Sequence, residues 1–174
     1  MSSRDVTEIE PRDRLQPALL DRLIRSEGDA ARVISKNELR QAVLRDLSWL
    51  FNATQPRAEW NQSHPLLAGT VLNYGLPPLA GHQLSKLDIA QLERTIAETI
   101  KRFEPRILPD TLVVQALESG SGVLDTHNMI EFEIRGQLWA QPVPLEILLR
   151  TQMDLEAGQV EVREGATAAP ARPR

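Results

Sequence analysis

The sequence predicts an α+β domain in which N-terminal helices pack on a small antiparallel sheet. Two observations lead to this prediction. Apolar residues recur every three or four positions up to about residue 103, as they do along one side of a helix. Beyond Pro109 they recur every second position, as they do on one face of a strand. Because the helical pattern comes first and the strand pattern follows it, helices and strands are segregated along the chain, which is typical of α+β folds.

The chain has 174 residues, which is long enough to bury one core, and we expect one domain over residues 35–164. Residues 1–34 form an N-terminal arm, partly helical or flexible, in which "PALLDRLIRS" can make a short helix that opens with Pro17. Residues 165–174, "GATAAPARPR", offer nothing to bury, so we expect a disordered tail.

The first helix of the domain begins at Ser35, which precedes Glu38 by the three residues of a capping box. A broad apolar arc follows, made of Leu39, Ala42, Val43, Leu47, Trp49, Leu50 and Phe51. The next stretch, "HPLLAGTVLNYGLPPLAGHQ", mixes proline and glycine with apolar residues, and we expect an ordered loop packed over the core.

The second helix is expected over about residues 86–103, because Ser85 precedes Asp88 by three residues and one apolar stripe follows. That stripe is made of Ile89, Leu92, Ile96, Ile100 and Phe103. It gives the helix a single buried side.

Three to four strands are expected as a meander beyond Pro109. Their sequences are "TLVVQALE", "MIEFEIRGQL", "LEILLRTQMDL" and, after a glycine turn, the short "QVEV". In the second strand we expect Glu131, Glu133 and Arg135 to face water. The last strand, made of Gln159, Val160, Glu161 and Val162, is a natural edge onto which a partner strand could add.

Composition excludes several classes of function. The formal net charge is −4 and no run rich in lysine or arginine is present, which argues against binding to nucleic acid. The chain has no cysteine, and His64, His82 and His127 lack metal-ligand spacing, so neither a metal site nor a cofactor is expected. The N-terminus has no signal-peptide pattern and no apolar run could cross a bilayer, so we expect a cytoplasmic protein without membrane insertion.

Acidic residues are concentrated in the predicted sheet. Residues 110–164 contain ten acidic residues and three arginines, a net charge of −7. This charge could steer a basic partner, or it could belong to a solvated face. It should also discourage self-association, so we expect the isolated protein to be a monomer.

Glu104 lies at the end of the second predicted helix, where the helix dipole disfavours a carboxylate. Pro105 forces the chain to turn there, and Arg106 follows. Three interpretations remain open. The turn could be a helix stop with solvated charges, it could display Glu104 and Arg106 to a partner, or it could lock the helix end onto the first helix.

Asp46 falls inside the apolar arc of the first helix. If it is buried it needs an arginine partner, because an unpaired buried carboxylate is costly. The alternative is that it lies at an exposed rim of the arc. The first case would favour the locking interpretation of the Glu104 turn.

Four segments, in the same order, resemble TssE, the wedge subunit family of type VI secretion baseplates. They are "RDLSWLFNATQ", "GTVLNYGLPPLAG", "RFEPRIL" and "IRGQLWAQPVPLEILLRTQMDLEAGQVEV", and the resemblance covers about residues 35–163. The Glu-Pro-Arg motif of that family matches Glu104, Pro105 and Arg106. The family is similar to the small wedge protein of contractile phage tail baseplates, which has long been labelled lysozyme-like.

The resemblance implies a structural role. Members join the wedge beside TssF and TssG, around a central spike hub, in several copies per baseplate. Their sheet is similar to the strand-exchanging domain of the sheath subunits TssB and TssC, so the chain would be a platform on which the sheath starts to polymerise.

Two other classes of function are compatible with parts of the sequence. The lysozyme-like label suggests a glycoside hydrolase acting on peptidoglycan, with Glu104 as acid and Asp110 or Asp46 as the second carboxylate. The few aromatic residues and the lack of a signal peptide argue against it. A generic cytoplasmic adaptor is the third class.

Overall fold

The computed structural model describes residues 19–24, 34–56, 63–79, 88–117, 129–140 and 143–165. Most of the predicted arm, the expected cap Ser85 and the predicted tail after Gly165 lie outside these residues. Within them, helices come first and the strands follow, which confirms the α+β fold.

Helices α2 and α4 begin at side-chain caps. Helix α1 spans Leu19–Ile24 and α2 spans Lys36–Asn52. The capping box of α2 is present, since the Ser35 hydroxyl accepts from the Glu38 amide while the Glu38 carboxylate accepts from the Ser35 amide. Helix α4 spans Ile89–Phe103 and is capped by Asp88, so it starts about one turn later than the sequence indicated.

The described strands form one four-stranded antiparallel meander in the order β1-β2-β3-β4. They are β1 (Val113–Leu117), β2 (Met129–Leu138), β3 (Leu145–Asp154) and β4 (Gln159–Glu164). The central pair β2 and β3 is in register over ten residues, with Phe132 opposite Thr151. Strands β1 and β4 are therefore the two edges of the sheet.

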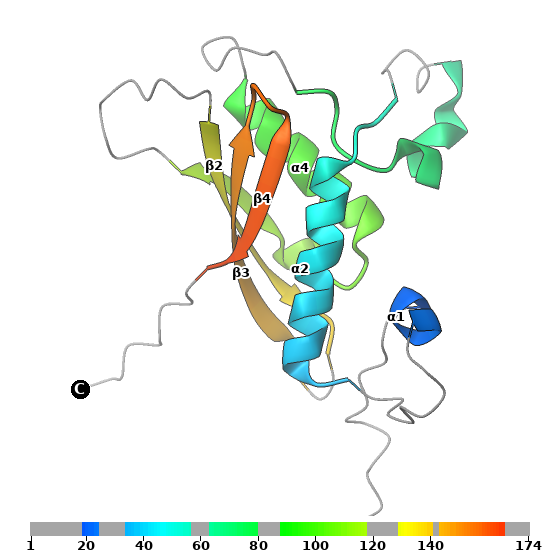
Figure 1. The fold of residues 1–174 in the computed structure, drawn as a ribbon, viewed down its shortest axis with the longest axis vertical. Helices are drawn as coiled ribbons and strands as arrows, with labels where there is room; N and C mark the ends of the chain where they lie inside the picture. Colours follow the sequence, from blue (N-terminus) through cyan, green and yellow to red (C-terminus); the bar gives the residue numbers. More distant parts are fainter. Residues whose placement is uncertain are drawn as a thin grey trace, which may run out of the picture.

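Helices α2 and α4 cover one face of this sheet (Figure 1). The core between them contains the predicted stripes of both helices and the alternating residues of the strands, including Leu47, Ile96, Ile100, Phe132, Ile134 and Leu149. The predicted strand alternation is confirmed in β3, where Ile147, Leu149, Thr151 and Met153 are buried.

Two side chains depart from the predicted pattern. Trp49, expected in the apolar arc of α2, is 51% exposed, and the guanidinium of Arg45 lies 4.9 Å from its ring centroid. Glu133, expected to face water, is buried because Arg135 donates to its carboxylate and Arg150 lies within 3.8 Å of it.

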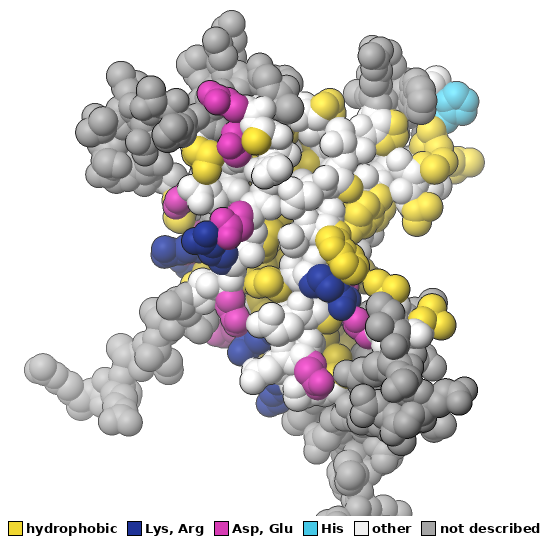
Figure 2. All heavy atoms as spheres, viewed as in Figure 1, with side chains coloured by type: hydrophobic (Ala, Val, Ile, Leu, Met, Phe, Trp, Pro, Cys, Tyr) yellow, Lys and Arg dark blue, Asp and Glu magenta, His cyan; other side chains and the backbone are white. Residues whose placement is uncertain are grey.

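The loop between α2 and α4 is only partly packed on the core. Its base is anchored, since the Leu76 amide donates to Ala53 O at 2.9 Å and the Gln55 amide donates to Leu76 O at 2.8 Å. Gly75 adopts a φ of 119° there. The short 3-10 helices η2 (Pro65–Gly69) and η3 (Val71–Asn73) instead expose Leu66, Val71 and Leu72, which contradicts the expected packing of this part. They lie beyond one end of α2, where hydrophobic side chains gather on the surface (Figures 1 and 2).

Candidate functional site

The Glu104–Arg106 turn closes on itself. Glu104 is the C-cap of α4, and its amide donates to Ile100 O at 2.8 Å. Its carboxylate accepts from Arg106 three times, from the backbone amide at 3.2 Å, from Nε at 2.7 Å and from Nη2 at 2.5 Å. The Glu104 side chain is only 4% exposed. The guanidinium therefore compensates a carboxylate that the helix dipole disfavours.

The same guanidinium reaches α2. Arg106 Nη2 donates to Asp46 Oδ2 at 2.5 Å, while Asp46 Oδ1 accepts from Arg45 Nε at 2.9 Å and from Arg45 Nη2 at 2.8 Å. Asp46 thus has two arginine partners. Of the three interpretations of the turn, the contacts match the one in which the end of α4 is fixed to α2.

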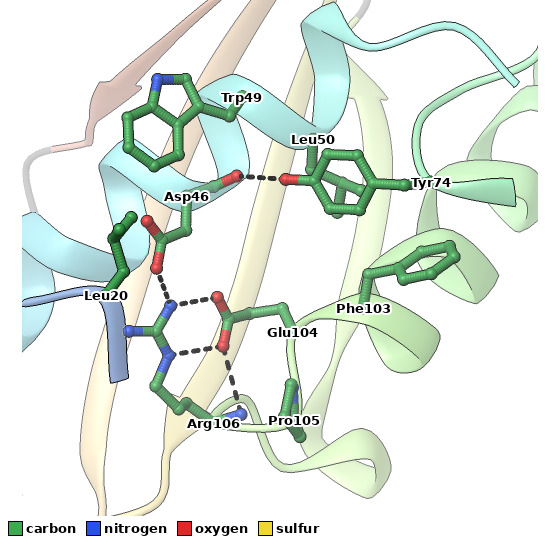
Figure 3. Close-up of a pocket in the computed structure, with 9 residues that line it drawn as sticks. All are labelled: Leu20, Asp46, Trp49, Leu50, Tyr74, Phe103, Glu104, Pro105 and Arg106. Atoms are coloured by element: carbon green, nitrogen blue, oxygen red, sulfur yellow. Dashed lines mark hydrogen bonds and ion pairs between the residues drawn. The ribbon is translucent and has the colours of Figure 1, made fainter. Parts of the chain in front are cut away.

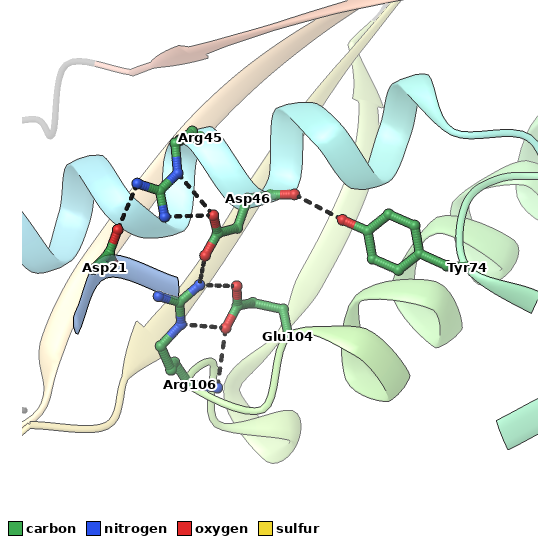
Figure 4. Close-up of polar contacts among 6 residues, drawn as sticks. All are labelled: Asp21, Arg45, Asp46, Tyr74, Glu104 and Arg106. Carbon is green, nitrogen blue, oxygen red and sulfur yellow. Dashed lines mark hydrogen bonds and ion pairs between the residues drawn. The ribbon is translucent and has the colours of Figure 1, made fainter. Parts of the chain in front are cut away.

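The chain of charges ends on α1. Arg45 Nη1 donates to Asp21 Oδ1 at 2.7 Å, so acidic and basic groups alternate from Asp21 to Glu104 (Figure 4). We call Asp21, Arg45, Asp46, Arg106 and Glu104 the charge network. It joins α1, α2 and the end of α4 through side chains from distant parts of the sequence.

The acidic groups of the charge network raise the pKa of Arg106, within the network, and that of Tyr74 beside it. Burial alone would lower the pKa of Arg106, but the hydrogen bonds and charges of Glu104 and Asp46 outweigh it and raise this pKa above its ordinary value. The pKa of Tyr74 is raised by burial and then by the negative charges of Asp46 and Glu104. The Tyr74 hydroxyl donates to Asp46 O at 3.4 Å, and its ring packs edge-on against Phe103 at 5.4 Å.

A groove of about 400 Å³ opens beside the charge network. Its apolar wall is made by Leu20, Trp49, Leu50, Tyr74, Phe103 and Pro105, and Asp46, Glu104 and Arg106 line its polar side (Figure 3). The Glu-Pro-Arg turn therefore lies against an open apolar surface. Its charged groups are already paired with one another.

The predicted edge strand β4 is partly covered. The Val160 amide donates to Asn52 Oδ1 at 3.0 Å, and Asn52 Nδ2 donates to Val160 O at 2.8 Å. Val160 is therefore not the free edge donor that the sequence indicated. Backbone groups alternate in direction along an antiparallel strand, so those of Val162 also point away from β3. Glu161 lies between these two valines and Arg163 follows the second. Their side chains form an exposed ion pair, with Arg163 Nη2 at 2.7 Å from Glu161 Oε2.

The opposite edge has a similar contact, because the Ala116 amide on β1 donates to Glu93 Oε1 at 2.7 Å. Each edge strand thus has one outward amide bound by a side chain from a helix. The sheet's bonding also extends past β4, since Gly165, assigned to the tail by sequence, donates to Leu148 O at 2.8 Å.

The sequence did not single out Arg45, Asp21, Tyr74 or Asn52. A usable signal existed for Arg45, which directly precedes an acid inside an apolar arc. Nothing in the local pattern pointed to Asn52, whose partner lies 108 positions away. Asp110, the other candidate for the second carboxylate of a glycoside hydrolase, is exposed on the 3-10 helix η5 (Pro109–Thr111) and does not line the groove.

Among the residues that the structure describes, no cluster of histidine, aspartate or glutamate could hold a metal ion. None of the helices described is long and apolar enough to cross a membrane.

Neither the curated proteins nor the solved structures contained a match to the chain. The model of a family described as baseplate wedge protein gp25 matches residues 37–143, more than half of the chain. The match runs from α2 through the Glu-Pro-Arg turn to the residues just after β2, and it ends before β3 and β4. The chain therefore belongs to the gp25 family of baseplate wedge proteins.

Proposed function

We propose that this chain is the small structural subunit of a type VI secretion baseplate wedge and that it connects the wedge to the contractile sheath. Membership of the gp25 family supports a structural role in a baseplate. The four segments that resemble TssE support the narrower assignment. The wedge partners are then TssF and TssG, the sheath partners are TssB and TssC, and the spike hub is a neighbour. The subunit acts in several copies at the cytoplasmic face of the inner membrane.

The observation that carries the sheath contact is the open end of the β4 edge. Asn52 covers Val160, whereas no described loop or side chain bonds to the outward backbone groups of Val162. A partner strand could add there through main-chain hydrogen bonds. Among the described residues, the open part of this edge therefore begins at Val162, so it is shifted toward the C-terminal end of β4 relative to the predicted Gln159–Val162.

Single prolines test this edge. We expect Val162→Pro to remain folded and to lose binding to TssB and TssC, because proline removes the outward donor without touching the bonds to β3. Val160→Pro also breaks the contact with Asn52, so it should be less stable. The readouts are circular dichroism for folding and a pull-down of purified sheath subunits.

The matched control lies on the other edge of the sheet. Val114→Pro on β1 changes an amide of the same orientation as that of Ala116, which faces away from β2. It should leave sheath binding intact. Normal binding by folded Val162→Pro, or loss of binding by folded Val114→Pro, would show that β4 is not the template.

The groove beside the charge network is the proposed contact with TssF and TssG. Trp49→Ser should weaken binding to a purified TssF–TssG complex with little effect on folding, because the side chain is half exposed. Leu66→Ser, which removes an 89% exposed side chain outside the groove, is the control. Equal binding by both variants would remove the groove from the wedge interface.

The Glu-Pro-Arg turn should matter for assembly in cells. Glu104→Ala or Arg106→Ala is expected to reduce the number of sheaths seen by fluorescence microscopy, although the fold survives. Sheaths of normal number and length in both variants would leave the turn with only a local role in ending α4.

The structural assignment also implies that the chain does not hydrolyse peptidoglycan. Both candidate carboxylates of the groove, Glu104 and Asp46, bind one guanidinium, so neither is free to protonate a leaving group. Purified wild type should match a buffer blank in a peptidoglycan turnover assay. Cleavage that Glu104→Gln abolishes would overturn the structural role.

A further inference from the structure

Helix α1 lies against the groove beside the charge network. Leu20 forms part of the groove wall, and Asp21 binds the outward Nη1 of Arg45 at 2.7 Å (Figures 3 and 4). These two contacts come from a segment that precedes α2 and lies outside the residues matched by the family model. The chain thus places part of its own N-terminal region on the surface assigned above to the wedge partners.

The two leucines of α1 whose exposure is described remain in contact with water. Leu20 remains 43% exposed and Leu23 remains 74% exposed. A helix of six residues has little stability of its own in water, because the cost of its first turn is not repaid over so short a length. Its position therefore depends on contacts such as the partly exposed pair between Asp21 and Arg45, which holds weakly.

α1 also leaves the groove unfilled. About 400 Å³ stays open with α1 in place, and Trp49, on the groove wall, keeps half of its surface in water. A binding partner complementary in shape to this groove would cover Trp49 and fill that volume. The contacts of α1 are those of a partial occupant.

We propose that α1 is a displaceable cover of this groove, and that the partner segment that replaces it is an amphipathic helix with a carboxylate for Arg45 beside an aliphatic side chain. The inference rests on the proposed wedge contact and adds to it the partner's chemistry and a competing segment. When α1 leaves, Arg45 keeps Asp46 through Nε and Nη2 but loses the partner of Nη1. An incoming carboxylate satisfies that donor, and a leucine-sized group replaces Leu20.

Competition between α1 and the partner segment for the groove leads to a quantitative prediction. A partner that binds only the open groove has its affinity reduced by the fraction of molecules in which α1 is undocked. Weakening α1 should therefore raise the affinity. A partly exposed ion pair corresponds to a factor of about three to five, so Asp21→Asn should tighten binding to TssF–TssG by about that factor.

The first test needs no partner. The chain has no cysteine, so Leu23→Cys can carry a single nitroxide label on the exposed side of α1. We expect the label to move faster when Asp21→Asn is added, because α1 undocks. A label at Val143→Cys, an exposed site outside the groove, should not respond. Equal mobility at position 23 with and without Asp21→Asn overturns the proposal.

The second test measures the affinity of the full-length chain for purified TssF–TssG. Asp21→Asn should bind more tightly than wild type, and Leu23→Ser, which changes an exposed residue of the same helix, should bind equally. Weaker binding by Asp21→Asn would mean that α1 belongs to the interface. This result would overturn the proposal that α1 is a displaceable cover. An unchanged affinity would overturn it too.

Trp49→Ser separates this inference from the proposed function. If Trp49→Ser loses binding while Asp21→Asn has no effect, the wedge contact stands and the cover is rejected. If Trp49→Ser binds as well as wild type, the groove is not the wedge contact. The cover is then rejected as a competitor of that partner, whatever the nitroxide label reports.

Discussion

Arg106 Nη2 donates to Asp46 Oδ2 at 2.5 Å, although the two residues lie 60 positions apart in the chain. This contact fixes the turn after α4 to the middle of α2. Arg106 also provides every side-chain donor described for the buried Glu104. One guanidinium therefore neutralises two carboxylates, so its loss should cost more than the loss of either acid.

Arg106→Ala should lower the free energy of unfolding by about 3 kcal/mol, the low end of the range for breaking a buried pair, because Arg106 is 23% exposed. Asp46→Asn should cost about 1 kcal/mol, since Glu104 keeps its partner. Urea denaturation measures both. Arg163→Ala, which breaks an exposed pair, should change little. If Arg106→Ala lowers the free energy of unfolding no more than Arg163→Ala does, the contacts of Arg106 with Glu104 and Asp46 do not stabilise the fold.

Tyr74 should titrate above its ordinary pKa of about 10, because it is partly buried and lies near Asp46 and Glu104. It is the single tyrosine of the chain, so the ultraviolet absorbance of its phenolate reports this one site. Asp46→Asn should move the midpoint down. A midpoint at or below that of an exposed tyrosine would contradict the described environment.

The same raised pKa predicts a dependence of stability on pH. The folded state holds the Tyr74 proton more tightly than the unfolded state, so its contribution is complete below about pH 10 and is lost as pH rises through the folded pKa. The difference in unfolding free energy between wild type and Tyr74→Phe should therefore shrink above that pH. A constant difference across this range would refute the linkage.

Asn52→Ala should destabilise the protein by about 1–2 kcal/mol, because it removes both bonds to the backbone of Val160. Asn52→Asp keeps an acceptor for the Val160 amide but loses the donor to its carbonyl, so its effect should be intermediate. Thermal unfolding of wild type, Asn52→Asp and Asn52→Ala ranks the three proteins by stability. If Asn52→Ala unfolds at the wild-type temperature, the contact contributes nothing to holding α2 on β4.

Gly75→Ala should be strongly destabilising. Its φ is 119°, so alanine would be strained there by about 1–3 kcal/mol. The added Cβ would also lie 2.3 Å from Ala53 O and would clash with the backbone. Gly69→Ala is the matched control in the same loop, because a Cβ there meets nothing within 4 Å. Urea denaturation should separate the two variants. Similar stabilities would show that the loop base can move.

The elements of this fold follow from local patterns, whereas several contacts between them do not. The 3-and-4 spacing of α2 and α4 and the alternation of β3 predicted which sides are buried, because periodicity determines the face that a residue occupies. Periodicity treats each side chain separately, however. It placed Glu133 in water, where two arginines cover its carboxylate, and it placed Trp49 in the core, although that side chain is half exposed.

The candidate site was predictable to a similar extent. A carboxylate at a helix C-terminus and another inside an apolar arc each indicated a missing cation, and Arg106 supplies it to both. The groove and the contact of Asn52 with β4 depend on how α1, α2 and the sheet meet in three dimensions. No pattern within a single segment could indicate them. The roles of these residues in partner binding remain predictions.

The contact between Asn52 and Val160 has a consequence for synthesis of the protein, because it spans 108 positions. Neighbouring strands of the meander pair with one another in chain order, so the sheet can grow as it leaves the ribosome. Helix α2 is made before the sheet, yet part of its apolar side packs on β4, the last of the described strands. In a nascent chain that stops before Val160, part of the apolar side of α2 therefore remains uncovered. The last strand completes the burial of one of the first helices.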